Sequence, residues 1–464
     1  MVAASIPVLE NYGLYSNGFL PASPPLARLI NSYYDPWESV MSKFNALLLA
    51  RRLQGVIEEL PVLSTQCLVT LPERQRAFML LGFLAHGYIW GRPEALDTLP
   101  ACIAKPWDEI AQLLGMRPVI CEAAVCLWNY RSLFENEPLN LDNLATLHTF
   151  TGSLDESWFY LVTTSIEAQG GPILPLILSA MSAAQNDDPV AFVQNLCQIA
   201  TILDSLNDTL ASMYERCDPR IFYHRVRPYL AGWNNMAEAG LPEGVVYQGC
   251  GDERPRTYAG GSAAQSPLIH ALDIALSVKH RPFGVVNKKA GQSSKKNFIL
   301  SMRDYMYGPH RLFLQDLESA ANIRQYVLEH QNNHDITAAY DACLAMIQAF
   351  RNKHIQIVTQ YIVNQSQAAR NNDEENIPPT FRPPVINGIA KTQGAVNVKG
   401  TGGTFLIPFL RQSRDETGEN AVGSWARHLI LSRFPGRVRN PDEEISQDMR
   451  GLASVWSEGA ICIV

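Results

Sequence analysis

The sequence predicts an all-α protein, with a small, mainly helical domain over residues 1–150 and a larger helical domain over residues 151–464. Two long stretches, residues 188–210 and residues 335–364, repeat apolar residues at helical steps. The first 150 residues contain only short pieces of the apolar and polar alternation that a half-exposed strand needs. Helices packed on helices are therefore expected in both domains.

Composition and charge narrow the class of protein. Of the 464 residues, 47% are hydrophobic and 18% are charged, which is ordinary for a globular protein with a large core. The net charge is −7, whereas nucleic-acid binding needs clustered Lys and Arg, so nucleic acid is not expected as a partner. The one basic cluster, within residues 288–296, is most simply a solvated loop.

Cysteine usage and the apolar runs predict where the protein works. Nine cysteines are scattered without a Cys-x-x-Cys pair, so neither a disulfide framework nor a zinc site is expected. No apolar run approaches the roughly 20 residues that cross a bilayer, and the first residues lack a secretory pattern. We expect a cytoplasmic protein without a membrane partner, and a monomer.

The N-terminal domain is expected to consist of a surface arm followed by three helices. Residues 1–32 carry four prolines, which favour an extended arm. A helix over residues 35–52 begins with a capping aspartate followed by proline. A second helix is expected over residues 72–90, where a glycine ends it, and a third over residues 118–130.

The larger domain is expected to contain helices separated by glycine and proline. A Gly-Gly-Pro run separates the first two helices, and an Asp-Pro pair ends the third. The expected helices cover residues 157–168, 174–184, 188–210, 267–278, 298–306 and 335–364.

The composition changes abruptly after the last of these helices. Residues 365–399 contain two Pro-Pro pairs, an acidic run and few large apolar residues. Such a segment buries too little apolar surface to fold stably, so a mobile loop is expected over residues 365–403. Its glycine-rich end, residues 400–403, is suited to close over a pocket.

One face of the helix expected over residues 335–364 is apolar. The residues on this face are Tyr340, Cys343, Ile347, Phe350, Ile357 and Tyr361. His354 falls on the same face, so its imidazole is expected to point inward, where it needs a partner. A proximal haem ligand would show the same spacing as a core histidine bound by a backbone carbonyl. On spacing alone, the core histidine is the favoured interpretation.

Five segments together resemble the indoleamine 2,3-dioxygenase family. Residues 351–359, RNKHIQIVT, resemble the proximal segment of that family. The others occur in the family's order and read WFYLV from Trp158, RPYLAGW from Arg227, YAGGSAAQS from Tyr258 and KGTGGT from Lys399. The resemblance extends over about residues 5 to 430. The sequence of residues 143–153 resembles that of fungal members of the family.

This resemblance implies a haem b cofactor enclosed by the large domain. The implied reaction opens the pyrrole ring of L-tryptophan between C2 and C3 with dioxygen, retains both oxygen atoms and yields N-formylkynurenine. That product begins the kynurenine pathway towards NAD. Two alternatives stay open, namely a dioxygenase for another indole in a secondary pathway and a haem-binding or signalling protein without turnover.

The resemblance also assigns residues to the haem. His354 would be the iron ligand, and Arg351, one helical turn earlier, would reach a propionate. A surface arginine is the alternative for Arg351. Asp273 would accept the imidazole N–H and strengthen ligation. Gly261 and Ser262 would lie against the haem edge.

For the substrate, the resemblance implies aromatic walls and one cation. Arg227 would bind the substrate carboxylate, although a salt-bridge role is its alternative. Phe159 and Phe222 would form the walls, although such residues are often core. No side chain is expected to act as acid or base, because dioxygen activated at the haem reacts. The residues expected at the substrate are Phe159, Thr163, Phe222, Arg227, Ser262, Ala263 and Thr401.

Two positions depart from the family's pattern. Thr163 stands where serine is usual, and its extra methyl group would narrow the pocket. One methyl group in a pocket changes the discrimination between two substrates by roughly 1–3 kcal/mol. Cys121 stands where some members have tyrosine, and a small thiol leaves room there. The sequence therefore leaves the identity of the indole open.

Overall fold

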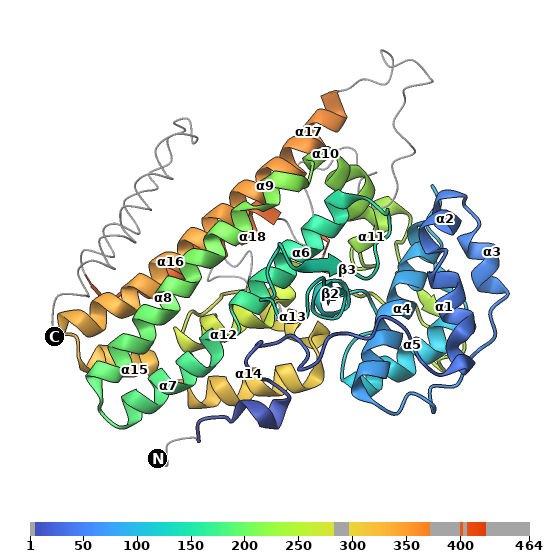
Figure 1. Ribbon diagram of the computed structural model, residues 1–464. Helices are drawn as coiled ribbons and strands as arrows, with labels where there is room; N and C mark the ends of the chain where they lie inside the picture. The colour runs from blue at the N-terminus through green and yellow to red at the C-terminus, as the bar shows by residue number, and fades with distance from the viewer. Residues whose placement is uncertain (1–4, 283–296, 372–399, 402–405, 424–464) are drawn as a thin grey trace.

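The computed structural model describes residues 5–282, 297–371, 400–401 and 406–423, and this part of the chain is mostly helical (Figure 1). The predicted all-α class is therefore confirmed. The α-helices are α1 (Asp35–Met41), α2 (Phe44–Leu49), α3 (Leu53–Glu58), α4 (Leu71–Trp90), α5 (Ala101–Leu114), α6 (Leu154–Gln169), α7 (Ile173–Gln185), α8 (Pro189–Ala211), α9 (Met213–Arg216), α10 (Pro219–Ile221), α11 (Arg227–Leu230), α12 (Pro267–Ala275), α13 (Phe298–Met302), α14 (Gly308–Ala320), α15 (Ile323–Glu329), α16 (His334–Val358), α17 (Asn364–Asn371) and α18 (Leu406–Gly418).

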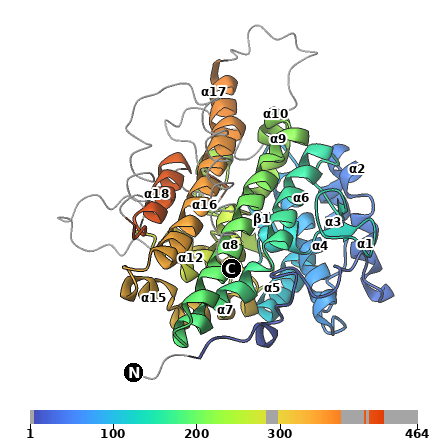
Figure 2. The same cartoon turned by 60° about the vertical axis from the view of Figure 1, so that its left-hand side comes forward.

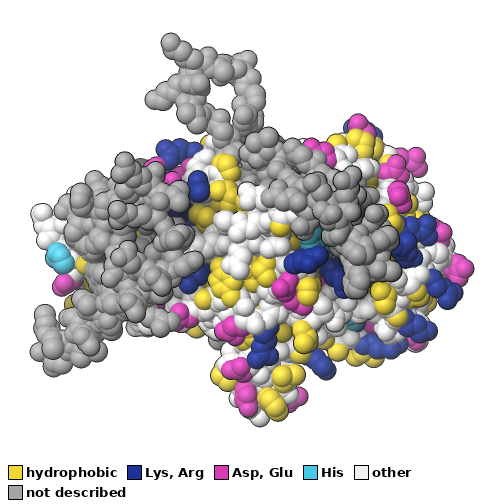
Figure 3. Space-filling model, turned by 90° about the horizontal axis from the view of Figure 1, so that it is seen from above, with side chains coloured by type: hydrophobic (Ala, Val, Ile, Leu, Met, Phe, Trp, Pro, Cys, Tyr) yellow, Lys and Arg dark blue, Asp and Glu magenta, His cyan; other side chains and the backbone are white. Residues whose placement is uncertain are grey.

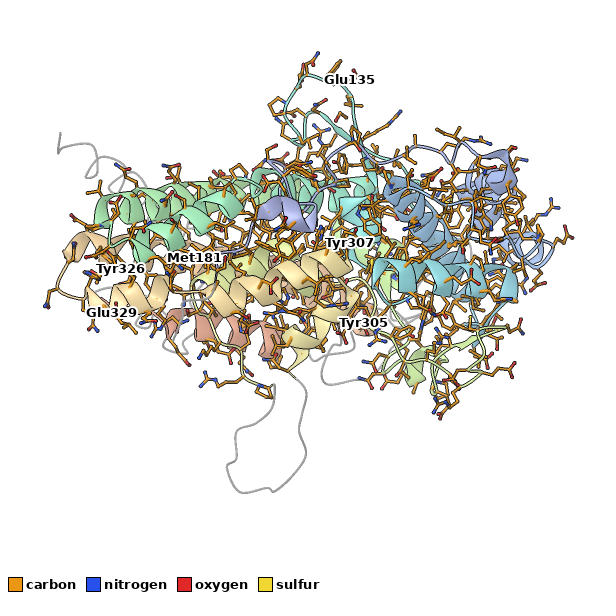
Figure 4. All side chains as sticks on the ribbon, turned by 90° about the horizontal axis from the view of Figure 1, so that it is seen from below. Glu135, Met181, Tyr305, Tyr307, Tyr326 and Glu329 are labelled. Carbon is orange, nitrogen blue, oxygen red and sulfur yellow. The ribbon has the colours of Figure 1, made fainter. Side chains whose placement is uncertain are left out.

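Short turns and strands complete the described fold. The 3₁₀ turns are η1 (Leu9–Tyr12), η2 (Ser32–Tyr34), η5 (Ala237–Ala239), η6 (Ala263–Gln265) and η7 (Arg303–Tyr305), and the π-helical turns are η3 (Ala123–Leu127), η4 (Phe222–Val226) and η8 (Thr359–Val363). Strand β1 (Thr98–Leu99) pairs in parallel with β4 (Val246–Tyr247), and β2 (Tyr130–Ser132) pairs antiparallel with β3 (Leu144–Thr146). Glu135 marks the projecting β2–β3 loop (Figure 4).

Helix α4 is the buried centre of the N-terminal helices. A capping box starts it, in which the Thr70 hydroxyl accepts from the Glu73 N–H and the Glu73 carboxylate accepts from the Thr70 N–H. Nearly every residue from Gln75 to Trp90 is buried, and α5 packs against this helix. Figure 1 shows α1–α5 gathered on one side of the molecule. The helix predicted over residues 72–90 is thus confirmed.

Two other predictions for this region are corrected. The helix expected over residues 35–52 is broken into shorter helices, and Arg51 has a left-handed φ of 56°, which a continuous helix does not tolerate. The helix expected over residues 118–130 is reduced to the π-helical turn η3. The sequence reading also missed α5, whose interior contains Pro106.

The long helices α8 and α16 lie side by side in the other half of the molecule (Figure 1). Their apolar stripes face each other, which explains why both were readable from the sequence. Helix α7 packs against α8 and meets α15 near Met181 and Tyr326 (Figure 4). Helix α18 packs along α16 (Figure 2). Within the described residues, none of the helices combines the length and apolarity that crossing a membrane requires.

The predicted domain boundary and loop are only partly visible. Strands β1 and β4 pair across the boundary at residue 150, and η1 packs on α14 through the rings of Tyr12 and Phe313, 5.5 Å apart. The division into two domains stays a prediction. Helix α17 covers the first residues of the segment predicted as a loop, and residues 372–399 and 402–405 lie outside the described residues.

The described surface carries both signs of charge. Figure 3 shows basic and acidic side chains interspersed over one face. The basic cluster within residues 288–296 lies outside the described residues.

Candidate active site

A cavity of about 270 Å³ lies among α6, α12, α16 and α18. Its wall is largely apolar, and every residue with a predicted role in binding haem or substrate lines it. These residues are Phe159, Thr163, Phe222, Arg227, Gly261, Ser262, Ala263, Asp273, Arg351, His354 and Thr401. The fold therefore brings the whole predicted site together, while the individual roles stay predictions.

His354 projects from α16 into this cavity. Burial first, and then the nearby Arg351 charge, lower the pKa of His354 to about 4. The imidazole is therefore neutral at physiological pH and offers a nitrogen lone pair. No carbonyl partner supports this imidazole among the described residues. The arrangement favours a ligand-binding histidine over one satisfied within the core.

The carboxylate of Asp273 has partners other than the one expected. Arg351 donates to its two oxygens at 2.8 and 2.7 Å, and His280 Nε2 lies 2.9 Å from Oδ2. Burial would raise the pKa of Asp273, but Arg351 and then His280 hold it well below its usual range. Among the described residues, the hydrogen bonds of Asp273 go to Arg351 and His280 and none joins it to His354, so the expected bond to the His354 imidazole stays a prediction.

His280 and Glu416 extend this cluster to α18. His280 Nδ1 lies 2.8 Å from Glu416 Oε2, and Arg351 also donates to the Thr417 hydroxyl. The side chains of His280 and Glu416 are 6% and 2% exposed, so both are nearly shielded from water. The cluster joins α12, α16 and α18 beside the cavity. Sequence reasoning missed both residues, because nothing near them in the chain signals a contact across more than a hundred residues.

One stripe of α6 faces the cavity at intervals of four residues: Phe159, Thr163 and Glu167. Phe159 and Phe222 lie with ring centroids 4.7 Å apart, which forms the expected aromatic wall. The Thr163 hydroxyl donates to the Phe159 carbonyl at 3.4 Å, a long bond within its own helix.

Arg227 follows the π-helical turn η4 and is only 1% exposed. Burial lowers the pKa of Arg227 to about 10, so the guanidinium still carries its charge at neutral pH. It lies 5.3 Å from the centroid of the Tyr223 ring, close enough for a cation–π contact. A buried charge at an apolar cavity is suited to bind a carboxylate.

The glycine-bearing segment from Gly261 to Ala264 forms another wall of the cavity, and Gly260 precedes it. The Thr401 hydroxyl donates to the Gly261 carbonyl at 2.6 Å, and the Gly260 N–H donates to the Thr401 carbonyl at 3.3 Å. A Cβ on Gly260 would lie 2.1 Å from the Leu230 carbonyl oxygen, so glycine is required at that position. A Cβ on Gly261 would meet nothing closer than 3.9 Å. The backbone approach that demands glycine is thus at Gly260.

Comparison with known proteins identifies the family. The family profile described as indoleamine 2,3-dioxygenase matches residues 8–420. An indoleamine 2,3-dioxygenase of Saccharomyces cerevisiae is 39% identical over 430 residues, covering 89% of this chain and 93% of that protein.

The chain belongs to the indoleamine 2,3-dioxygenase family.

Two further relatives differ in their named substrates. An indoleamine 2,3-dioxygenase of Aspergillus nanangensis is 37% identical over 426 residues, covering 89% of this chain and 97% of that protein. A 6-hydroxytryptophan 2,3-dioxygenase of Fusarium equiseti is 31% identical over 418 residues, covering 90% of this chain and 98% of that protein. The protein is accordingly an enzyme, a dioxygenase of the indoleamine type.

Cys121, which was expected to leave room in the pocket, does not line the described cavity, whereas the next residue does. Cys121 is buried and is absent from the described cavity wall, so the room predicted from its small thiol is not in the cavity. Its neighbour Glu122 lines the wall instead, together with Glu167. Neither glutamate was predicted for the site.

Thr163→Ser is expected to widen the indoleamine 2,3-dioxygenase cavity. Removing the methyl group should change kcat/KM by up to about a hundredfold for tryptophans methylated on the six-membered ring, and by less for tryptophan. Steady-state kinetics of both proteins with both substrates measure this. Identical selectivity would assign Thr163 to packing alone.

His280 is expected to make stability depend on pH. Burial alone would lower the pKa of His280, but its hydrogen bonds to Asp273 and Glu416 outweigh burial and raise the pKa above 6.5. This contribution is fully present below pH 6.5 and is lost as pH rises through the raised pKa of the folded state.

His280→Gln should therefore cost roughly 1–3 kcal/mol of unfolding free energy near pH 6, and less at higher pH. Thermal or urea unfolding across this range measures the difference. The idea fails if the gap between the two proteins stays constant or widens as pH rises.

Proposed function

We propose that the protein binds haem b and opens the pyrrole ring of L-tryptophan to N-formylkynurenine. The observation that carries this proposal is that a neutral imidazole, a buried guanidinium and two aromatic rings line one cavity. In the reaction the C2–C3 bond breaks and each carbon gains one atom of dioxygen. We further propose that the enzyme is a cytoplasmic monomer at the first step of the kynurenine pathway towards NAD.

The residues at the cavity fit a haem. His354 would supply the axial nitrogen, since its imidazole is neutral and faces the cavity. The apolar residues around it suit the porphyrin, and Gly261 and Ser262 would lie against its edge. Arg351 would place positive charge near a propionate while it also binds Asp273. When bound, haem supplies the iron at which dioxygen is activated.

The remaining residues would position the substrate. Arg227 would hold the carboxylate by paired N–H donors, which orients the amino-acid end. Phe159 and Phe222 would flank the indole, and Thr163 would limit its size. The Thr401 hydroxyl donates its hydrogen bond to the Gly261 carbonyl, so it would hold the glycine-bearing wall in place. Thr401 would therefore affect the substrate indirectly, through the position of that wall. Positioning of this kind lowers the barrier without an acid or base from the protein.

A second candidate is a dioxygenase for a substituted indole. A carboxyl group in the cavity wall, that of Glu122, favours a substrate with a polar substituent. The Fusarium relative whose name specifies 6-hydroxytryptophan supports such a variation within the family.

The experiment supplies purified, haem-loaded protein with a reductant, dioxygen and L-tryptophan, or with substituted tryptophans. Formation of N-formylkynurenine from L-tryptophan supports the proposal. Product formed solely from substituted indoles supports the second candidate. A haem spectrum without product from any indole would show a haem-binding protein without this activity.

A further inference from the structure

Two buried carboxyl groups line the cavity without a complete set of partners. Glu122 is 4% exposed, and neither of its carboxyl oxygens has a hydrogen-bond partner among the described residues. Glu167 is 1% exposed; its Oε1 accepts from the Ser266 hydroxyl, whereas its Oε2 has no partner in that part of the chain. A buried polar group without a partner costs free energy, so such oxygens in a cavity wall point to a ligand.

The position of Glu122 is held by its backbone. Its N–H donates to the Gln265 side-chain oxygen at 3.0 Å, and the Gln265 amide donates to the Gly260 carbonyl at 2.9 Å. Gln265 therefore links Glu122 to the glycine-bearing wall. A carboxyl group anchored in this way is preorganised to meet a bound molecule.

The two carboxyl groups act on each other. The pKa of Glu122 is raised, first because burial disfavours the charged form and then because Glu167 lies close. Burial likewise raises the pKa of Glu167. A neutral carboxyl group both donates and accepts hydrogen bonds, so the pair suits a hydroxyl or amino group better than an isolated carboxylate would.

The carboxyl groups and Arg227 come from different elements of the cavity wall, since Glu122 precedes η3, Glu167 lies on α6 and Arg227 begins α11. Glu167 also lies two helical turns from Phe159 on α6, roughly 12 Å along the axis. A substrate whose carboxylate binds Arg227 would therefore present its other end to a different element of the wall.

We propose that Glu122, supported by Glu167, binds a hydroxyl or amino group on the six-membered ring of the indole substrate. This inference rests on the proposed function and extends its substrates to ring-hydroxylated or ring-aminated tryptophans. L-Tryptophan fits the same cavity but leaves the carboxyl pair without a ligand atom. Glu122 is accordingly a specificity-determining residue.

The test compares tryptophans that carry a hydroxyl group at each position of the six-membered ring with their methyl counterparts, which have similar size but no donor. We expect the native protein to favour at least one hydroxyl compound, and Glu122→Leu to reduce that preference by about tenfold to a hundredfold. Glu122→Gln, which keeps hydrogen-bonding atoms, should retain part of it. Glu135→Leu, the same change on the exposed β2–β3 loop, should leave it unaltered.

Binding is measured separately, from the shift in thermal unfolding midpoint that each compound produces. This readout also confirms that Glu122→Leu folds, as expected when an apolar side chain replaces a buried carboxyl group. Equal binding and turnover of hydroxyl and methyl compounds by native protein and Glu122→Leu would overturn the inference while leaving tryptophan turnover intact. An equal loss for L-tryptophan in Glu122→Leu would also overturn it, since Glu122 would then bind the ammonium group. Absence of turnover with every indole would instead reject the proposed function.

Discussion

His354→Ala is expected to abolish stable haem binding and, with it, all turnover. The imidazole of His354 is neutral, lines the cavity and has no carbonyl partner among the described residues. Of the other histidines, His86 bonds the Tyr229 carbonyl at 2.8 Å and His270 bonds the Ala264 carbonyl at 3.0 Å, so both are engaged in the core. Neither can replace an axial nitrogen on α16 without breaking those bonds.

The matched control for this substitution is His334→Ala, an exposed histidine at the start of the same helix. The Soret band and the haem content of the purified proteins provide the measurement. The control should bind haem as the native protein does. A native Soret band together with full turnover in His354→Ala would exclude His354 as the ligand.

Arg227→Ala is expected to raise KM for tryptophan by at least about a hundredfold. Removing one partner from a desolvated charge pair leaves the other charge unpaired, which costs roughly 3–5 kcal/mol. The haem spectrum should stay nearly normal, because Arg227 is assigned to the substrate and not to the haem. Steady-state kinetics with L-tryptophan measure the effect.

Arg225→Ala offers a control two residues away, at an exposed position of the preceding turn η4. It should leave KM close to its native value. Indole derivatives without a carboxylate give an independent check, because the native protein should use them poorly. An unchanged KM in Arg227→Ala, or equal use of those derivatives, would remove Arg227 from substrate binding.

Periodicity explains what could be predicted from sequence. Helices α8 and α16 carry enough residues for a 3.6-residue pattern to stand out, so their positions and the inward direction of His354 were readable. Short helices such as α2 and α3 carry too few turns for that. Helix α5 was missed because Pro106, accepted in its interior, suggests a helix end.

Contacts between distant segments explain what could not be predicted. Asp273, His280 and Glu416 meet through three separate parts of the chain, so the partners of Asp273 are set by tertiary packing. Glu122 escaped notice for a local reason. It immediately precedes the π-helical turn η3, and the 3.6-residue period used to assign faces does not hold there.

The proposed reaction is tested most directly by following the oxygen atoms. Haem-loaded protein, a reductant and L-tryptophan are supplied with isotopically heavy dioxygen in ordinary water, and the product is analysed at once by mass spectrometry. We expect N-formylkynurenine that carries both heavy oxygen atoms. Product with a single heavy atom, or consumption of dioxygen without ring opening, would contradict a dioxygenase that cleaves the tryptophan pyrrole ring.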